Sequence, residues 1–526
     1  MSGLRICLVE PRPPGHHVYD RVLLPRLGLP LIATMLAGAG HHVTVYCEML
    51  EPVDLAACAA ADLAGISSTT STAPAAYRLA DMLEAAGAPV VLGGPHVTFR
   101  PGEALEHAHY VVRGEGEQTM LELVAALQRD APLHQVAGLS WRDAGGGQHH
   151  NKPRGRCSQA EFEALPAPDL SLIAGHGRMT IKPLMTQWGC PYDCEFCAVT
   201  AMFSRRVRYR RTAQVLAELA GLNADRVFFH DDNFVVNKAR TAELLHAMAA
   251  AGLTPEWSAQ VRADTVYRSH SGCEIDHEFL DLMRQAGCHM VMAGFESISD
   301  AGLARLGKQA TVADSERAVA AFHDHGIDVH GMFVLGLDTD TRHSAQDTVA
   351  FARRVGIDTI QMMVQTPLPG TRLWDRIQAE GRLITMDWSL FDGHHVVMRP
   401  EQMTPLDLQL SVLEAMKRFY SWPAILSSGI TAVTWQLPAL ARLAARPAVA
   451  VRLPSIARLA AGRRWAELGQ LLRGCLSPAE LTRLGDAFTR PVLRWYGRHQ
   501  LGAWQAQQQS RDHLARLILN AGPVQP

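Results

Sequence analysis

Three cysteines stand close together in the segment GCPYDCEFC at residues 189–197, where Cys190, Cys194 and Cys197 have the spacing C-x3-C-x2-C. Three thiolates satisfy three irons of a 4Fe–4S cubane, and the fourth iron then stays open to a small molecule. Zinc is the competing metal, although a closed structural zinc site takes four protein ligands. A packing role is disfavoured because proline and polar neighbours indicate a loop. The motif therefore predicts a catalytic iron–sulfur cluster.

Alternating strand and helix patterns surround this loop over residues 184–400. Six units of this kind are too few for a closed barrel of eight, so the segment predicts a partial TIM-type (β/α)6 barrel. In such barrels the chemistry gathers at the carboxyl ends of the strands. Strands are expected at 184–188, 226–230, 256–261, 289–295, 328–335 and 359–366, and helices at 212–222, 240–252, 276–287, 312–325 and 344–356.

Polar side chains recur where these strands end. Asp231 and Asp232 follow the second strand, and Gln260 and Arg262 lie at the end of the third. Glu296 follows the fourth strand. One carboxylate at a strand end is often structural, but the recurrence at successive ends predicts a binding site around the cysteine loop.

The cysteine loop and its place after the first barrel strand resemble the radical S-adenosylmethionine (SAM) superfamily, over residues 184–370. The resemblance implies that the open iron binds SAM and that one electron, from a donor such as flavodoxin or ferredoxin, releases a 5′-deoxyadenosyl radical. It also implies which residues contact SAM: Phe196 beside the adenine, Asp231 and Asp232 near the amino acid part, Gln260 and Arg262 near the ribose or carboxylate, and Glu296 near the ribose or ammonium.

Residues 1–135 show a second alternation of strands and helices. The pattern predicts an α/β, Rossmann-like domain with a doubly wound parallel sheet. Strands are expected at 5–10, 42–48, 63–69, 89–93 and 109–113, and helices at 28–38, 73–86 and 118–129. Glycine, serine and threonine follow several of these strands, at the sheet edge where open α/β folds bind ligands.

This order of loops resembles the cobalamin-binding domain that is fused to many radical SAM enzymes, over about residues 3–130. The resemblance implies that the cofactor is lined by Ser67, Thr69, Gly93, Gly94, Gly114 and Glu115. The D-x-H-x-x-G signature of a histidine lower ligand is absent, so the cobalt would have no histidine ligand. His96 is the one candidate, and we expect it to be a hydrogen-bonded turn residue instead. An alternative is a scaffold domain that holds no cofactor.

The methylthiotransferase group is another radical SAM alternative, because its members carry a second cluster on three N-terminal cysteines. Here Cys7 and Cys47 fall in expected buried strands and Cys58 in an alanine-rich helical stretch. Buried cysteines usually pack as small hydrophobic residues. That group also ends in an all-β RNA-binding domain, whereas this chain ends in a helical pattern. We therefore reject this alternative.

Residues 136–183 are polar and rich in proline and glycine, which predicts a linker with a small hairpin.

Residues 401–526 predict a basic, tryptophan-rich helical region. From residue 419 onward there are 13 Arg, no Lys and 4 Asp or Glu, with five of the ten Trp. Arginine beside apolar helix faces is typical of an interfacial helix on anionic lipid. The alternatives are a cap over the barrel and a solvated helical region, and a nucleic-acid partner is disfavoured.

The 526 residues predict two to four domains, and 48% hydrophobic content is ordinary for a globular protein. No signal segment is apparent and no apolar run reaches the roughly 20 residues that span a bilayer, so we expect a cytoplasmic protein, peripheral to the membrane at most. The predicted activity is cobalamin-dependent methylation of an unactivated carbon in a small, hydrophobic or lipid-like substrate. Radical rearrangement, cyclisation or carbon–carbon coupling is the alternative, and a non-catalytic cobalamin-binding protein is another.

Overall fold

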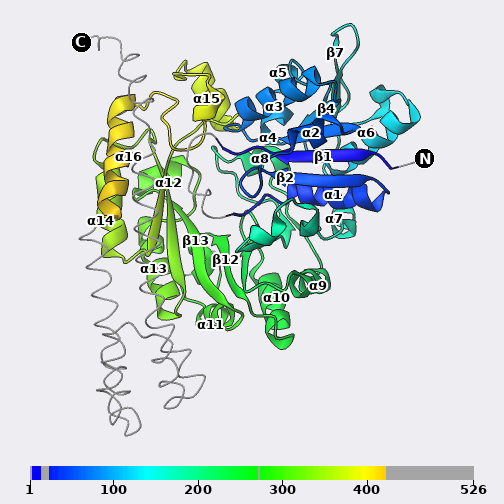
Figure 1. Ribbon diagram of the computed structural model, residues 1–526. Coiled ribbons are helices and arrows are strands. Elements are labelled where there is room, and N and C mark those ends of the chain that lie inside the picture. Colours follow the sequence, from blue (N-terminus) through cyan, green and yellow to red (C-terminus); the bar gives the residue numbers. More distant parts are fainter. Residues whose placement is uncertain (1–2, 14–22, 270–272, 422–526) are drawn as a thin grey trace, which may run out of the picture. The chain divides into compact units, whose positions relative to one another are not determined.

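The computed structural model describes residues 3–13, 23–269 and 273–421. The described residues up to Leu413 belong to one compact unit, and those from Glu414 onward belong to a second. The first unit contains two parallel sheets, which correspond to the two alternating segments of the sequence (Figure 1). The tail prediction for residues 422–526 lies outside the described residues.

The first sheet has the strand order β2-β1-β3-β4-β5-β6-β7. Its five parallel strands are β1 (Arg5–Glu10), β2 (His42–Cys47), β3 (Leu63–Ser67), β4 (Val90–Gly93) and β5 (Tyr110–Val112), which confirms the predicted doubly wound sheet. Two antiparallel strands, β6 (Leu139–Arg142) and β7 (Gln148–His150), continue the sheet beyond β5. The hairpin expected in the linker is therefore present, and the sheet extends past residue 135.

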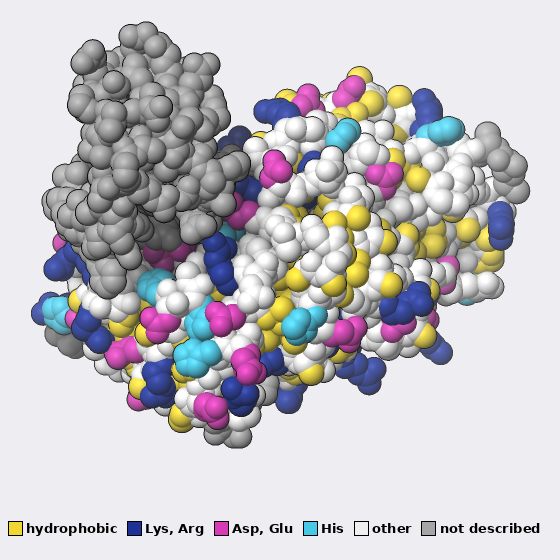
Figure 2. Space-filling model, turned by 90° about the horizontal axis from the view of Figure 1, so that it is seen from below, with side chains coloured by type: hydrophobic (Ala, Val, Ile, Leu, Met, Phe, Trp, Pro, Cys, Tyr) yellow, Lys and Arg dark blue, Asp and Glu magenta, His cyan; other side chains and the backbone are white. Residues whose placement is uncertain are grey.

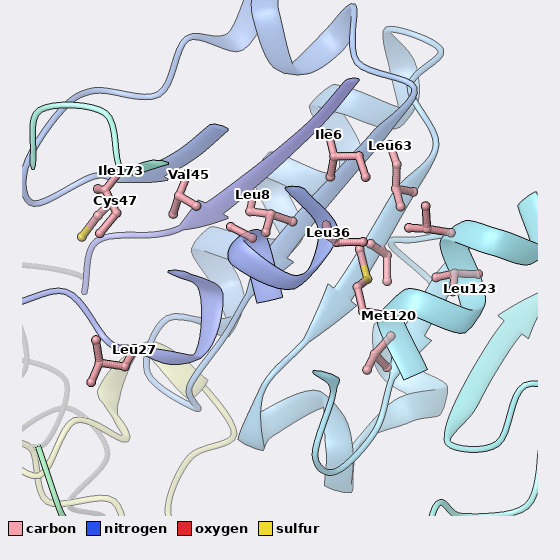
Figure 3. Packing of buried hydrophobic residues seen from close by; sticks show 14 of the residues in the cluster. Ile6, Leu8, Leu27, Leu36, Val45, Cys47, Leu63, Met120, Leu123 and Ile173 are labelled. Atoms are coloured by element: carbon pink, nitrogen blue, oxygen red, sulfur yellow. The ribbon is translucent and has the colours of Figure 1, made fainter. Parts of the chain in front are cut away.

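Helices cover both faces of this sheet, and the side chains of its interior strand β1 alternate between the two faces. Ile6 and Leu8 point to the face covered by α1 (Gly28–Gly38) and α6 (Glu117–Arg129), as Figure 3 shows. Cys7 and Val9 point to the other face, covered by α2 (Leu55–Ala59) and α3 (Ala73–Ala85). All four side chains are buried, which explains why the strand reads as one continuous apolar run.

The three N-terminal cysteines are packed as the sequence predicts. Cys47 lies in the core on the α1 side (Figure 3), and Cys7 and Cys58 lie together in the core on the α3 side. Burial raises the pKa of Cys47 to about 12, so this thiol stays protonated at neutral pH. The structure thus supports the rejection of a second cluster site on these cysteines.

The second sheet contains six parallel strands in the order β15-β14-β13-β12-β11-β8, and the two outer strands do not pair with each other. This is the predicted partial barrel. Its strands are β8 (Lys182–Leu184), β11 (Arg226–Phe229), β12 (Glu256–Val261), β13 (Cys288–Glu296), β14 (Asp328–Leu335) and β15 (Thr359–Val364). The helices that follow them include α9 (Thr212–Leu222), α10 (Lys238–Ala250), α11 (His277–Gln285), α13 (Val312–Asp324) and α14 (Ser344–Arg354).

The first barrel strand is shorter than predicted. It ends at Leu184, and residues 187–188 form β9 (Gln187–Trp188), which pairs antiparallel with β10 (Arg208–Tyr209) outside the barrel sheet. The backbone N–H groups of Thr186 and Gln187 donate to the Asp231 side chain. The expected strand 184–188 is therefore two pieces, and the second piece leads into the cysteine loop.

The chain after β15 continues as α15 (Arg372–Ala379), the short turn η6 (Trp388–Leu390) and α16 (Pro405–Phe419). None of the helices that the structure describes is both long and apolar enough to cross a membrane. On the face in Figure 2, acidic and basic side chains are interspersed, and hydrophobic side chains emerge between them.

Candidate active site

The cysteine loop starts at a glycine that no other residue could replace without strain. Gly189 has a φ of +87°, and a Cβ atom there would lie 2.1 Å from the carbonyl oxygen of Arg206. Glycine alone adopts this backbone conformation readily and permits this close approach. Cys190, Cys194 and Cys197 follow and are all half-buried, and α8 (Ala198–Phe203) begins directly after the last of them.

The three thiols suit a cluster in which each thiolate binds a different iron. Burial raises the pKa of Cys190 and of Cys194, and raises that of Cys197 to about 11. Bound iron would therefore have to displace the thiol protons, as metal binding commonly does. Among the described residues, no three His, Cys, Asp or Glu side chains converge closely enough to hold one metal ion. A cubane does not need such convergence, because each thiolate binds its own iron. Three soft sulfur donors on one loop fit a cubane.

Asp231 fixes the strand that leads into this loop. Its carboxylate accepts hydrogen bonds from Thr186 N at 2.7 Å, Thr186 Oγ1 at 2.6 Å and Gln187 N at 3.2 Å. The residue is 1% exposed, and burial raises its pKa to about 7. These contacts give Asp231 a role in supporting the strand, and its predicted contact with SAM stays a prediction.

Asp232 lies directly against the cysteine loop. Its Oδ2 accepts a hydrogen bond from Gly189 N at 3.0 Å, and burial raises its pKa to about 6. Its charge also acts on the Cys190 and Cys197 thiols. Asp232 thus lies beside the cysteines, and its predicted contact with SAM stays a prediction.

Arg262 joins the end of β12 to the middle of the cysteine loop. Its guanidinium lies 3.6 Å from the ring centroid of Tyr192, within the range of a cation–π interaction. Asp264 completes the group, since Arg262 Nε donates to its Oδ1 at 3.2 Å and the Tyr192 hydroxyl donates to its Oδ2 at 3.4 Å. Gln260, also predicted to contact SAM, is half-buried on the same strand.

Glu296 is held in an unusual backbone conformation at the end of β13. Its φ is +65°, which costs energy for a residue other than glycine. Its carboxylate pairs with Lys308 Nζ at 3.0 Å, and that ammonium also donates to the carbonyl of Gly294 at 3.2 Å. A Cβ atom on Gly294 would lie 2.7 Å from Glu296 Oε1, so this glycine makes room for the folded-back side chain. Glu296 and Lys308 both act electrostatically on Cys194.

Helix α15 contacts the cysteine loop through two arginines. Arg372 donates to the carbonyl of Asp193 at 2.7 Å, and Arg376 Nε donates to the Glu195 carboxylate at 2.8 Å. Phe196 packs against a small cluster that includes Leu373. Sequence analysis missed the two arginines and Lys308, because nothing in the local pattern links them to a loop more than a hundred positions away.

The predicted cobalamin residues meet at the carboxyl edge of the first sheet. Gly94 has a φ of +102°, and a Cβ atom there would lie 2.4 Å from Ser68 O and 3.2 Å from Ser67 Oγ. Gly93 O accepts a hydrogen bond from Ser68 N at 2.9 Å. Thr69 is tied into its own turn, where its backbone N donates to Thr72 Oγ1 at 2.9 Å. The loops after β3 and β4 are therefore packed tightly together.

Two glycines at the same edge have open space beside them. A Cβ atom on Gly28 or on Gly114 would meet no atom within 4 Å, and Gly114, with a φ of +76°, is linked to the β4 loop through a hydrogen bond from its N to Thr98 Oγ1. Ser68 Oγ is buried without a protein partner among the described residues. Open space above glycine backbone together with an unused hydroxyl fits a large cofactor at this edge.

The side chains of Glu115 and His96 are both buried and both have protein partners. The Glu115 side chain is buried and forms an ion pair with Arg208 of β10, and its predicted corrin contact stays a prediction. His96 is 1% exposed, lies 3.4 Å from the Glu103 carboxylate through Nε2, and stacks edge-on against Trp388. His96 is thus a buried turn histidine, as the sequence predicts.

Comparison with known proteins agrees with both halves of this site. A family model of the B12 binding domain matches residues 21–124, and a model of the radical SAM superfamily matches residues 185–352. The chain therefore belongs to the radical SAM enzymes that carry a B12-binding domain. The cofactors of this class are a 4Fe–4S cluster, SAM and cobalamin.

Within this family the chain is similar to methyltransferases. It is 31% identical to an uncharacterized methyltransferase of Pyrococcus horikoshii, over 82% of this chain and 95% of the relative. It is 27% identical to the bacteriochlorophyllide d C-12(1)-methyltransferase of Chlorobaculum tepidum, over 80% of this chain and 88% of the relative. The structure of TsrM from Kitasatospora setae, a radical SAM methyltransferase with cobalamin and a 4Fe–4S cluster bound, has a TM-score of 0.59 at 18% identity, over 72% of this chain and 75% of that chain, which confirms the fold.

Proposed function

We propose that this enzyme methylates an unactivated carbon of a small hydrophobic substrate. The observation that carries the proposal is that one compact unit contains both a three-cysteine loop and an open, glycine-lined sheet edge. When bound, SAM on the cluster supplies a 5′-deoxyadenosyl radical, and cobalamin supplies the methyl group. The two relatives named above are methyltransferases, and this supports transfer of a methyl group.

In this proposal the chain's own residues bind and orient the cofactors. Cys190, Cys194 and Cys197 hold three irons and leave the fourth open to SAM. The SAM contacts are assigned to Phe196, Asp232, Gln260, Arg262 and Glu296, and the corrin contacts to Ser67, Thr69, Gly93, Gly94 and Gly114. Lys308 is added to the residues around SAM, because it pairs with Glu296 and places a positive charge near Cys194.

The interior of the barrel supports a hydrophobic substrate. On the central strands, side chains alternate between buried positions and partly exposed ones, and the exposed set includes Met292, Met332 and Met363. Methionine is flexible and polarizable, and it adapts to apolar ligands of irregular shape. We therefore assign a small, apolar or lipid-like molecule to this space, with a flavodoxin or ferredoxin as electron donor.

A cysteine exchange tests the radical half of the proposal. Cys194→Ala should abolish both the bound iron and the release of 5′-deoxyadenosine from SAM under reducing conditions, because the cubane loses one of its protein ligands. Cys273→Ala is the control, since Cys273 is an exposed cysteine outside the loop. Undiminished 5′-deoxyadenosine from Cys194→Ala would refute the assignment of this loop.

A labelling experiment tests the methyl-transfer half without knowledge of the substrate. Protein loaded with reduced cobalamin and incubated with SAM labelled in its methyl group should transfer the label to the bound cobalamin. Label that stays in SAM, in protein that does produce 5′-deoxyadenosine, would favour rearrangement or coupling instead.

Peripheral membrane contact is a further proposal, and sedimentation with anionic liposomes should be lost on truncation after residue 421.

A further inference from the structure

A buried ion pair connects the first sheet with the hairpin that holds the cysteine loop. Arg208 Nη1 lies 2.6 Å from Glu115 Oε1, and their side chains are only 4% and 7% exposed. Cys157 completes the group, because Arg208 Nη1 donates to its sulfur at 2.8 Å and its backbone N donates to Glu115 Oε2 at 2.7 Å. Both charges are therefore largely shielded from solvent.

Aromatic rings enclose the remainder of the Arg208 guanidinium. Its carbon lies 5.6 Å from the Trp188 ring centroid, 5.7 Å from Phe203 and 6.0 Å from Phe162. Nε and Nη2 are buried without a protein hydrogen-bond partner among the described residues, so the rings provide their main stabilisation. Arg208 therefore has one strong anionic partner, and its geometry depends on where that partner lies.

The partners of this pair belong to the two cofactor loops. Glu115 directly follows Gly114, whose open side we assign to cobalamin. Arg208 pairs in register with Trp188, the residue before Gly189 and the cysteines. Phe203 is the last residue of α8, the helix that begins after Cys197. A shift of either loop would therefore change the environment of a charge that is shielded from solvent.

We infer that Glu115 and Arg208 are positioning residues that couple cobalamin binding at the Gly114 loop to cluster binding at the cysteine loop. The inference rests on the proposed function, since it assumes that cobalamin lies on the Gly114 loop. Well-packed apolar residues usually replace a buried ion pair without loss of stability, so a pair of this kind is better suited to fixing one arrangement of two loops than to adding stability. Coupling between two binding sites is reciprocal and typically amounts to 5–150-fold in affinity.

The test compares cobalamin affinity in protein with and without the reconstituted cluster, measured by the absorbance of hydroxocobalamin under anaerobic conditions. In the wild type, the cluster should strengthen cobalamin binding by about fivefold or more. In Glu115→Gln and in Arg208→Gln this ratio should fall to about one. Because a single exchange leaves a buried group unpaired, the double variant Glu115→Gln/Arg208→Met provides a folded protein without either charge.

Glu218→Gln is the matched control. Glu218 pairs with Arg210, two residues beyond Arg208, with side chains 5% and 6% exposed, but both partners belong to the barrel segment. This variant should keep the wild-type coupling ratio. Equal loss of coupling in Glu218→Gln, or an unchanged ratio in the Glu115 and Arg208 variants, would overturn the inference. A wild type that binds no cobalamin would refute the proposed function and this inference with it, whereas cobalamin binding that is indifferent to the cluster would refute the inference alone.

Discussion

Asp231 offers the sharpest distinction between a residue that supports the cysteine loop and one that contacts the cofactor. Two exchanges separate these roles. Asp231→Asn keeps the shape of the side chain and an oxygen that can accept from both Thr186 N and Gln187 N, whereas Asp231→Ala removes all three hydrogen bonds that the carboxylate accepts. If Asp231 only supports the loop, the two variants should differ strongly.

The expected magnitudes follow from the burial of the site. Each buried donor left without a partner costs about 1–3 kcal/mol, so Asp231→Ala, which leaves three donors unpaired, should lose about 3–9 kcal/mol of unfolding free energy. This is a large share of the roughly 5–15 kcal/mol that a domain has. Asp231→Asn should lose only about 1 kcal/mol, since the pKa of about 7 means that the carboxyl is partly neutral already at neutral pH.

Two measurements on each variant check these values. Denaturant unfolding gives the change in free energy, and iron per chain after anaerobic reconstitution gives the occupancy of the cysteine loop. We expect Asp231→Asn to match the wild type in iron and in SAM affinity, and Asp231→Ala to lose both along with stability. A stable Asp231→Asn protein with wild-type iron and a SAM affinity reduced tenfold or more would refute this reasoning, because the carboxylate charge would then act on the cofactor.

Two further predictions concern the backbone and the pH dependence. Gly189→Ala should lower iron per chain severalfold, because its φ of +87° and the 2.1 Å approach to Arg206 O admit no Cβ atom, while Gly221→Ala on α9, where nothing lies within 4 Å, should leave iron unchanged. Burial alone would raise the pKa of Asp392, but its hydrogen bond with His395 lowers it to about 2 from 3.8. A depressed carboxyl pKa stabilises the fold above the unfolded value and loses this contribution as the pH falls toward 2, so Asp392→Asn should be about 2 kcal/mol less stable at pH 5, a deficit that shrinks toward pH 2 in denaturant titrations.

The sequence predicted those parts of the molecule that local patterns determine. Continuous apolar runs such as residues 5–10 mark strands that are buried on both faces, and the spacing of Cys190, Cys194 and Cys197 identifies the loop without any tertiary information. The count of six barrel strands followed from the same alternation. These features depend on residues close together in the chain, which is why a single sequence was sufficient for them.

What the sequence could not give is the partner of each charged side chain. No local pattern predicts that the Asp231 carboxylate contacts Thr186 or that Glu115 pairs with Arg208. Lys308 was missed entirely, although it pairs with Glu296 across the strand end. Such pairings are set by how strand ends and loops meet in three dimensions, and no periodicity in the chain records them.

The central claim, that one chain holds a radical SAM cluster and cobalamin together, is tested most directly by metal analysis. Protein should be purified without oxygen from cells supplied with iron, sulfide and cobalamin, and iron and cobalt should be determined per chain. We predict about four iron and one cobalt. Iron without cobalt would contradict the assignment of the glycine-lined edge to cobalamin, and cobalt without iron would contradict the assignment of the cysteine loop.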